Sequence, residues 1–141
     1  MKVLFDTNVV LDVLLDREPF SKEALYLLSE VERGEVTGYL CATTVTTIFY
    51  LLSKALGTAE ARPHTKSLLS LFIVAPVSRV VLENAINLDF RDFEDAVIHE
   101  AALHAGANYI VTRNVSDFKS TKLPVYKPDE LVAIIKILRG E

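Results

Sequence analysis

Short apolar runs alternate along the chain with longer segments in which apolar residues recur every three or four positions. The short runs are 2–5, 39–42, 72–75, 109–112 and 125–126, and each is typical of a strand buried on both faces of a parallel sheet. The longer segments predict helices that begin at residue 9 and cover 21–33, 43–56, 59–71, 78–88, 93–105 and 129–138. This alternation predicts one α/β domain over residues 1–141, with a central, mainly parallel sheet flanked by helices.

Residues that favour helix ends delimit several of these segments. Asn8, Ser78 and Asp92 are the expected N-caps, because their short polar side chains accept hydrogen bonds from the first helical N–H groups. Pro63 places the start of the fourth helix near itself, since proline is poorly tolerated inside a helix. Pro128 fits the first turn of the last helix.

The charge balance limits how the chain meets nucleic acid. The 141 residues include 15 Lys and Arg against 19 Asp and Glu, a formal net charge of −4. A mildly acidic protein has no general attraction to nucleic acid or to anionic membranes. Any contact with nucleic acid must therefore come from a local basic patch, aided by metal ions.

The N-terminus and the cysteine count indicate the compartment. Asp6 interrupts the first apolar run too early for the apolar region of a signal peptide, and no run approaches the ~18 apolar residues of a membrane span. Cys41 is the only cysteine, which excludes an intrachain disulfide and a cysteine-based zinc cluster and fits a reducing compartment. We expect a cytoplasmic protein with no membrane contact.

Polar residues cluster where the carboxyl ends of the strands are expected. Helix N-termini lie at the same edge of such a sheet as the carboxyl ends of the strands. We therefore expect one site at this edge, the acidic mouth, to contain Asp6, Asp92, Asp95, Asn114 and Asp117. Carboxylates gathered without matching bases repel one another, and a bound divalent cation relieves that repulsion. An all-oxygen ligand set suits Mg²⁺ or Mn²⁺, which activate water for attack on a phosphodiester.

Structural roles account for some of the same residues. Asp92 is an ordinary N-cap, Asp95 completes a pair resembling a capping box, and Asp117 closes a turn. Asp6 is harder to explain in this way, because a carboxylate directly after a buried strand loses its hydration. The residues alone leave the metal site and the structural interpretation open.

Other common sites have little support. The chain has neither a G-x-G-x-x-G nor a P-loop motif. His99 and His104 lie about 140° apart around a helix, so they cannot both bind one zinc ion, and we expect both at the surface or partly packed. Asp12 and Asp16, one turn apart and followed by Arg17, are typical of a solvated helix face.

Three segments in order resemble the PIN-domain family, the nucleases typified by VapC-type toxins of prokaryotic toxin–antitoxin pairs. They are Val3–Asp12, Asp92–Ile98 and Tyr109–Asn114 with the following Asp117-Phe118. The order, the spacing and the chain length agree with the family over essentially the whole sequence. The resemblance implies a PIN-like three-layer fold with a central, mainly parallel sheet flanked by helices.

The resemblance also implies an activity: an endoribonuclease that depends on Mg²⁺ or Mn²⁺. Asp6, Asp95 and Asp117 would bind the metal, and Asn8 and Thr112 would orient the ligands or water. Asn114 would join the catalytic group through its carbonyl oxygen, at a position where many members carry an aspartate.

The chain departs from the family at Thr47, where a metal-binding Glu is usual at the start of a helix. A hydroxyl can hold metal-bound water or a phosphate, but it cannot neutralise a cation. Asp92 or Glu94 would have to compensate from the neighbouring turn, and otherwise metal affinity should be weaker.

A basic loop beside the mouth is the expected RNA contact. Arg113, Lys119 and Lys122 lie on it, with Arg91 nearby, and they would hold RNA phosphates. The alternative is that they are solvated loop charges. Phe118 is expected to anchor this loop in the core.

Two other functions remain open from the sequence. The first is phosphoryl transfer through Asp6, against which stands Asn8 where a second Asp is usual. The second is a catalytically weak or inactive PIN-like domain that binds RNA or protein, which Thr47 favours. The apolar surface of 25–31 and 45–56 would serve a homodimer or an antitoxin protein.

Overall fold

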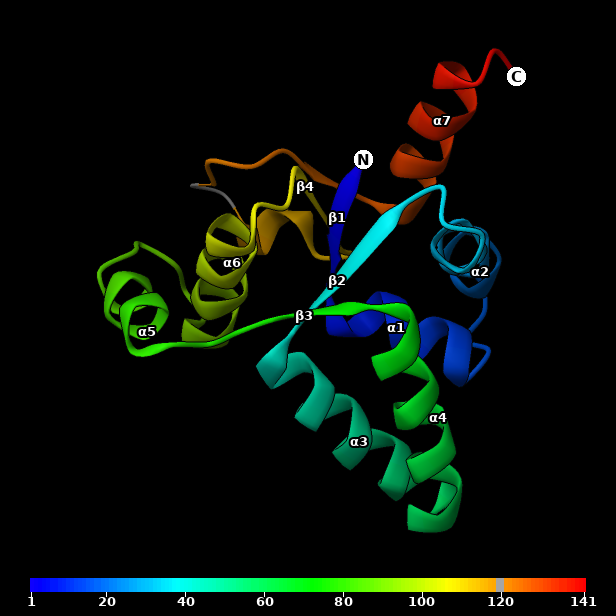
Figure 1. Ribbon diagram of the computed structural model, residues 1–141, viewed down its shortest axis with the longest axis horizontal. Coiled ribbons are helices and arrows are strands. Elements are labelled where there is room, and N and C mark those ends of the chain that lie inside the picture. The colour runs from blue at the N-terminus through cyan, green and yellow to red at the C-terminus, as the bar shows by residue number, and fades with distance from the viewer. Residues whose placement is uncertain (119–120) are drawn as a thin grey trace.

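The computed structural model describes residues 1–118 and 121–141 (Figure 1). They form a five-stranded sheet of order β3-β2-β1-β4-β5 and the helices around it. All four neighbouring strand pairs are parallel, as the sequence predicts. The strands are β1 (Lys2–Phe5), β2 (Thr37–Cys41), β3 (Ile73–Ala75), β4 (Tyr109–Val111) and β5 (Val125–Tyr126).

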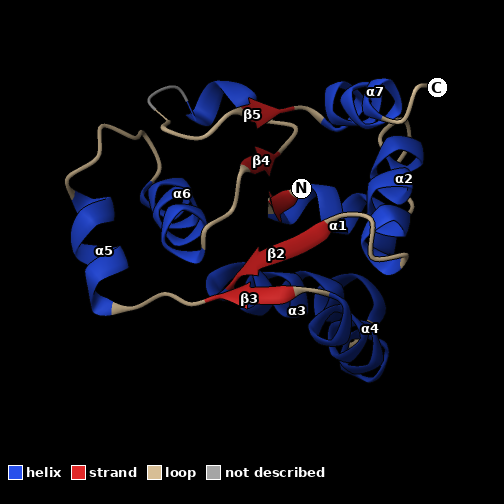
Figure 2. Cartoon of the chain, turned by 45° about the horizontal axis from the view of Figure 1, so that its top comes forward, coloured by secondary structure: helices blue, strands red, loops and turns tan. Residues whose placement is uncertain are grey.

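Helices cover both faces of the sheet and produce three layers (Figure 2). They are α1 (Thr7–Leu14), α2 (Ser21–Glu32), α3 (Ala42–Leu56), α4 (Thr58–Leu71), α5 (Arg79–Ile86), α6 (Phe93–Ala105) and α7 (Pro128–Leu138). Alternate strand residues point to opposite faces, so Val3 and Phe5 pack with α1–α4 and α7, whereas Leu4 packs with α5 and α6. The predicted three-layer α/β fold is confirmed.

The order of the strands reverses beside β1. The chain moves outward from β1 to β2 and β3, and then returns to place β4 on the other side of β1. Phe5 pairs with Val111, and the Asp6 amide donates to the Val111 carbonyl at 3.0 Å. Ligands of parallel α/β sheets bind outside the carboxyl ends of the strands at such a point.

Two predicted helix starts are wrong. Helix α1 begins at Thr7, with Asp6 rather than Asn8 as its N-cap, because the Asp6 carboxylate accepts from the Thr7 amide at 2.8 Å. Helix α4 begins at Thr58 and continues through Pro63. Ala61, two residues earlier, is fully buried against the core, so packing of the first turns outweighs the hydrogen bond lost at the proline.

In the part of the chain that the structure describes, no helix has both the length and the apolar character needed to cross a bilayer.

Helix α7 is held against α2 by a buried carboxylate. The Glu30 side chain is fully buried and accepts from Arg33 Nη2 at 2.6 Å and from Arg139 Nη1 at 2.7 Å, with Arg139 Nη2 on its second oxygen. Lys136 of α7 also lies 5.3 Å from the centre of the Tyr26 ring of α2. The Arg139 guanidinium holds the pKa of Glu30 below its ordinary value of 4.5.

We expect Arg139→Ala to lower the free energy of unfolding by about 2–3 kcal/mol, because it leaves a buried carboxylate with one partner fewer. Chemical denaturation checks this, with Arg79→Ala as the control, since the Arg79–Glu83 pair is exposed. A lowered pKa stabilises the fold above the ordinary value, so the loss should be complete at pH 7 and should shrink as the pH falls below 4.5. We call the contact of Glu30 with Arg139 the clamp between α2 and α7. An equal loss of unfolding free energy in the two variants would contradict its stabilising role.

Candidate active site

Asp6, directly after β1, is a buried carboxylate with a fixed orientation. Its side chain accepts from the Thr7 amide at 2.8 Å, from Thr112 Oγ1 at 2.7 Å and from Asn8 Nδ2 at 3.2 Å. Burial raises the pKa of Asp6, and these hydrogen bonds oppose that rise. Asn8 and Thr112, which we expect to orient ligands or water, both hydrogen-bond to Asp6, and their roles in catalysis stay a prediction.

Asn8 and Thr112 also join the ends of β1 and β4 to each other. Asn8 Oδ1 accepts from the Arg113 amide at 3.2 Å, and Thr112 Oγ1 accepts from the Asn114 amide at 3.0 Å. Thr112 is fully buried, so its one hydroxyl proton is committed to Asp6. This small network fixes Asp6 relative to the backbone that carries Asn114.

The first turn of α6 brings further carboxylates to the same edge. Asp92 caps the helix by accepting from the Glu94 amide at 2.8 Å, which accounts for its structural role. Asp95 is half-buried, and burial together with the negative charges of Asp6, Asp92, Asp117 and Glu94 raises its pKa to about 7. Each of the predicted acidic residues therefore acts on Asp95.

Thr47 of α3 lies beside Glu94 of α6. Burial and the charges of Asp92 and Asp6 raise the pKa of Glu94, and the nearby polar side chain of Thr47 opposes the rise. The Thr47 hydroxyl itself donates to the Thr43 carbonyl at 3.0 Å. Glu94 thus stands next to the residue for which the sequence suggests it compensates.

Asp117 reaches the site from the turn that follows β4. A short 3₁₀ helix, Val115–Phe118, carries it, and its amide donates to the Asn114 carbonyl at 3.0 Å. Phe118 is buried, with its ring edge-to-face against Phe90 at 5.9 Å between centroids. The prediction that Phe118 anchors the loop is confirmed.

The carboxylates at this edge have no cationic partner within 1–118 and 121–141. None of the ion pairs there involves the five acidic residues of the mouth, which are Asp6, Asp92, Glu94, Asp95 and Asp117. Nor do three acidic, His or Cys side chains of the same ranges stand close enough to enclose an ion. The donor set nevertheless fits a divalent cation in kind, because it offers only oxygen atoms and uncompensated negative charge.

Asp12 is fully buried, which corrects the expectation of a solvated face. Its carboxylate pairs with Arg17 Nε at 2.8 Å and with Arg113 Nε at 2.8 Å, so two guanidinium groups replace its hydration. The ring of Phe20 covers Arg113, with the guanidinium carbon 4.0 Å from the ring centre. The sequence shows the Asp12–Arg17 spacing, but no local pattern reports a contact with Arg113, 101 positions away.

His99 is also buried, although we expected it at the surface or partly packed. Its Nδ1 lies 3.0 Å from a Glu100 carboxylate oxygen, and its Nε2 accepts from the Lys122 amide at 3.2 Å. Burial lowers the pKa of His99, so the ring is neutral and ties α6 to the loop. The Lys122 side chain is exposed, and Lys119 lies outside the described residues.

Residues 2–116 match the family model of the PIN domain, and the chain belongs to the PIN-domain family. A toxin–antitoxin complex from Klebsiella pneumoniae contains a similar structure, with a TM-score of 0.69, 24% identity, and coverage of 89% of this chain and 97% of that one. VapBC2 from Rickettsia felis, bound to a DNA fragment from its promoter, gives a TM-score of 0.66 and 17% identity over 90% and 98%. VapC20 from Mycobacterium tuberculosis, a toxin that cleaves the sarcin–ricin loop, gives 0.62 and 14% over 77% and 86%. No curated protein matches the chain.

We expect Asp95→Asn to stabilise the metal-free protein at alkaline pH. A carboxyl whose pKa rises from 3.8 to about 7 on folding weakens the fold as the pH climbs through that interval. Allowing for solvent screening of a half-buried group, the gain in unfolding free energy should be about 1 kcal/mol at pH 8 and near zero at pH 4. Denaturation in EDTA at both pH values measures it.

Glu60→Gln, which removes an exposed carboxylate of α4, is the matched control and should change little at either pH. A pH-independent effect of Asp95→Asn would mean that neither burial nor the neighbouring charges raise the pKa of Asp95.

Proposed function

We propose that this PIN-domain protein is an endoribonuclease that depends on Mg²⁺ or Mn²⁺. The observation that carries the proposal is the group of carboxylates from β1, α6 and the turn after β4, none of which has an ion-pair partner within the described residues. Family membership supports a nuclease, and the structural likeness to a toxin that cleaves the sarcin–ricin loop favours RNA as the substrate.

Asp6, Asp95 and Asp117 are the proposed metal ligands. When bound, the ion would supply an activated water and neutralise charge on the phosphodiester. The chain's own part is to hold these oxygens ready: Thr112 and Asn8 fix Asp6, and the 3₁₀ turn fixes Asp117. Asn114, beside this group, offers an uncharged carbonyl oxygen to water or substrate.

The proposed RNA contacts lie on the loop that follows β4. Arg113 is the one whose position is fixed, by Asp12 and by the Phe20 ring. Lys122 and Lys119 stay proposed contacts from the sequence, as does Arg91. Their charges would face phosphates on either side of the carboxylates.

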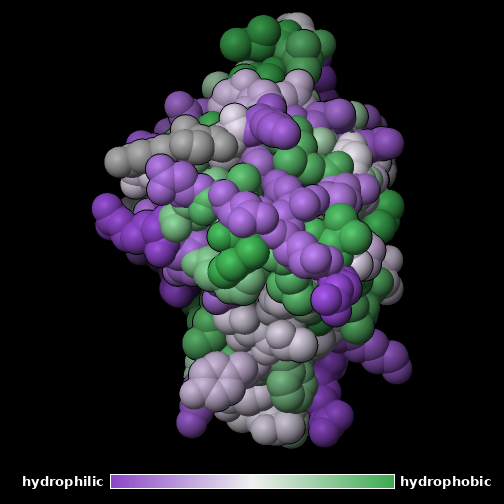
Figure 3. Space-filling view, turned by 90° about the vertical axis from the view of Figure 1, so that its left-hand side faces the viewer, coloured by the Kyte–Doolittle hydropathy of each residue, from purple (hydrophilic) through white to green (hydrophobic). Residues whose placement is uncertain are grey.

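A protein partner and a second copy of the chain are part of the proposal. The similar Klebsiella pneumoniae structure is a toxin–antitoxin complex, which supports an antitoxin for this chain and a cytoplasmic toxin role. Apolar side chains are exposed on α3 at Tyr50 and Leu51, and on α5 at Val80, Leu82 and Ile86. Figure 3 shows green apolar groups among charged ones on the face that α5 and α6 form, and such surface suits a homodimer or an antitoxin.

We expect Asp6→Asn to abolish metal-dependent cleavage of RNA while leaving the fold intact. The amide keeps the size of the side chain but removes the charge that would bind the ion. A mixed RNA pool incubated with Mn²⁺, Mg²⁺ or EDTA measures cleavage, and circular dichroism checks the fold. Asp95→Asn should lose activity in the same way.

Glu32→Gln, an exposed carboxylate at the end of α2, is the control and should cut like the wild type. Cleavage by Asp6→Asn at the wild-type rate would reject the proposed ligand set.

We expect Thr47→Glu to raise the affinity for Mn²⁺ by about tenfold, because it adds a carboxylate beside Glu94. Calorimetry measures the affinity without reference to activity. Thr46→Glu is the matched control, since Thr46 is exposed on the same helix. Equal affinities for the two variants would show that position 47 does not face the ion.

A second function has one observation in its favour. Thr47 removes a carboxylate that the family usually supplies, so a PIN-like domain that binds RNA or protein without cutting is the alternative. RNA binding with neither metal binding nor cleavage by the wild type would favour it.

A further inference from the structure

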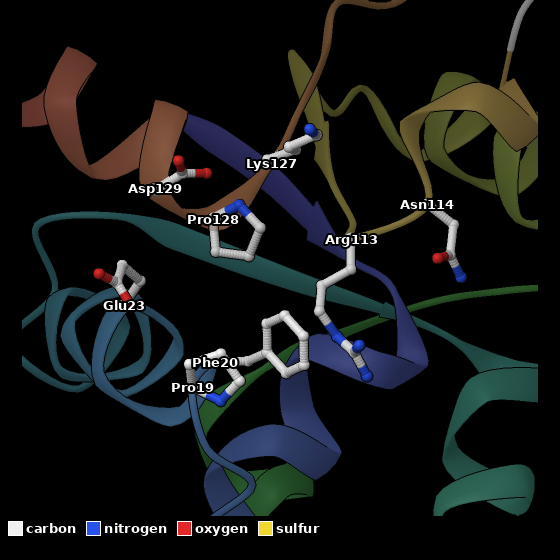
Figure 4. A pocket seen from close by; sticks show the side chains of 8 residues that line it. All are labelled: Pro19, Phe20, Glu23, Arg113, Asn114, Lys127, Pro128 and Asp129. Carbon is white, nitrogen blue, oxygen red and sulfur yellow. The ribbon is translucent and has the colours of Figure 1, made fainter.

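A cavity of 460 Å³ lies beside the acidic mouth, on the side of the sheet that α1, α2 and α7 cover (Figure 4). Its walls come from three places: the loop before α2 with the first turn of that helix, the residues that follow β4, and the start of α7. Its volume falls in the range of about 300–1,000 Å³ that is typical of small-ligand sites.

The cavity has an apolar wall and a polar one. Phe20, half-exposed, forms the apolar wall with Pro19 and Pro128, and Figure 4 shows its ring facing the space between them. Arg113, Asn114 and Lys127 also line the cavity and supply hydrogen-bond donors. A planar aromatic group with an attached anion is the ligand that matches both walls.

The guanidinium of Arg113 is positioned before any ligand arrives. Asp12, fully buried, pairs with its Nε at 2.8 Å and accepts from its Nη2 at 3.3 Å, and Phe20 covers the guanidinium at 4.0 Å. Because Arg17 shares the same carboxylate, the three groups together carry one net positive charge. That charge lies next to carboxylates with no ion-pair partner among the described residues.

Two residues that line the cavity are linked by backbone hydrogen bonds to the side-chain partners of Asp6. Asn114 lines the cavity, and its backbone N–H donates to Thr112 Oγ1. The Thr112 hydroxyl in turn donates to Asp6. The amide of Arg113 is bonded to Asn8, the other side-chain partner of Asp6. If the phosphate that is cut lies at Asp6, a neighbouring nucleotide of the same RNA strand would therefore lie at the cavity.

Side chains of both charge signs line the cavity: Glu23 and Asp129 are acidic, and Arg113 and Lys127 are basic. An acidic peptide would meet those two carboxylates with its own and be repelled. A nucleotide presents base-edge N–H groups to carboxylates and a phosphate to cations, so it fits the mixed lining better.

We propose that this cavity is a subsite for one nucleotide of the RNA, next to the phosphate that is cut. The base stacks against the wall of Phe20, Pro19 and Pro128, and its phosphate is bound by Arg113 and Lys127. This inference rests on the proposed ribonuclease function.

The test is binding of a short fluorescent oligoribonucleotide to the full chain in EDTA, where no cleavage occurs. Phe20→Ala and Lys127→Ala should each weaken binding about tenfold. The slope of log affinity against log salt should fall by about 0.7 for Lys127→Ala and stay unchanged for Phe20→Ala, because only lysine neutralises a phosphate. Loss of packing alone would not separate the two variants in this way.

The controls remove equivalent groups elsewhere. Leu25→Ala truncates an exposed apolar side chain of α2, and Lys66→Ala removes an exposed cation of α4, so both should bind RNA like the wild type. Phe20→Leu keeps most of the apolar packing without the aromatic ring, and it should also weaken binding if the ring stacks on a base. Melting temperatures verify that each variant is folded.

Wild-type affinity in both cavity variants would overturn the subsite and leave the cavity to a protein segment. If the wild type cuts RNA and the variants have an unchanged KM, the subsite fails while the ribonuclease stands. If RNA binds through the cavity but no metal supports cleavage, the ribonuclease fails, and the cavity is an RNA-binding site with no cleavage point beside it. A raised KM with an unchanged kcat at saturating RNA supports both.

Discussion

A carboxylate can lie below the surface at the end of β1 because three hydrogen bonds replace its water. One comes from the next backbone amide, one from Asn8 and one from Thr112 on the neighbouring strand. Thr112 reaches Asp6 only because β4 pairs with β1 in a register that matches Phe5 with Val111. The strand order at the centre of the sheet and the position of the candidate site therefore depend on the same contact, the pairing of β1 with β4.

The fold treats buried negative charge in two opposite ways. Asp12 and Glu30 are fully buried, and each has two arginine partners, so their charges are compensated inside the protein. Asp6 and Asp95 have hydrogen bonds or neighbouring carboxylates but no ion-pair partner in the ranges that the structure describes. One arginine could compensate the repulsion at this edge of the sheet, yet none does so among the described residues, which is the physical reason to expect a cation there.

Much of this arrangement could be predicted from the sequence. Apolar runs and helix periodicity predict the five parallel strands and the helices, and the strand-end rule predicts that Asp6, Asp95 and Asp117 meet. The contacts that could not be predicted are those between distant segments. In the sequence Asp12 resembles a solvated residue, but in the fold it pairs with Arg113, which follows β4. His99 likewise resembles a surface residue, but in the fold it accepts a hydrogen bond from the Lys122 amide. Helix α4 continues through Pro63 because Ala61 is buried against the core, a balance that local propensity does not contain.

The clamp between α2 and α7 has a consequence for the cavity at their other ends. Both helices begin at the cavity, with Phe20 and Glu23 at the start of α2 and Lys127 just before α7. Both finish near Glu30 and Arg139, where the ion pair joins them. The two helices are therefore joined at their C-terminal ends, and the cavity lies at their N-terminal ends. The ion pair between Glu30 and Arg139, which is not part of the cavity lining, limits the width of the cavity. Substitutions at Glu30 or Arg139 should therefore alter the shape of the cavity without changing any residue that lines it.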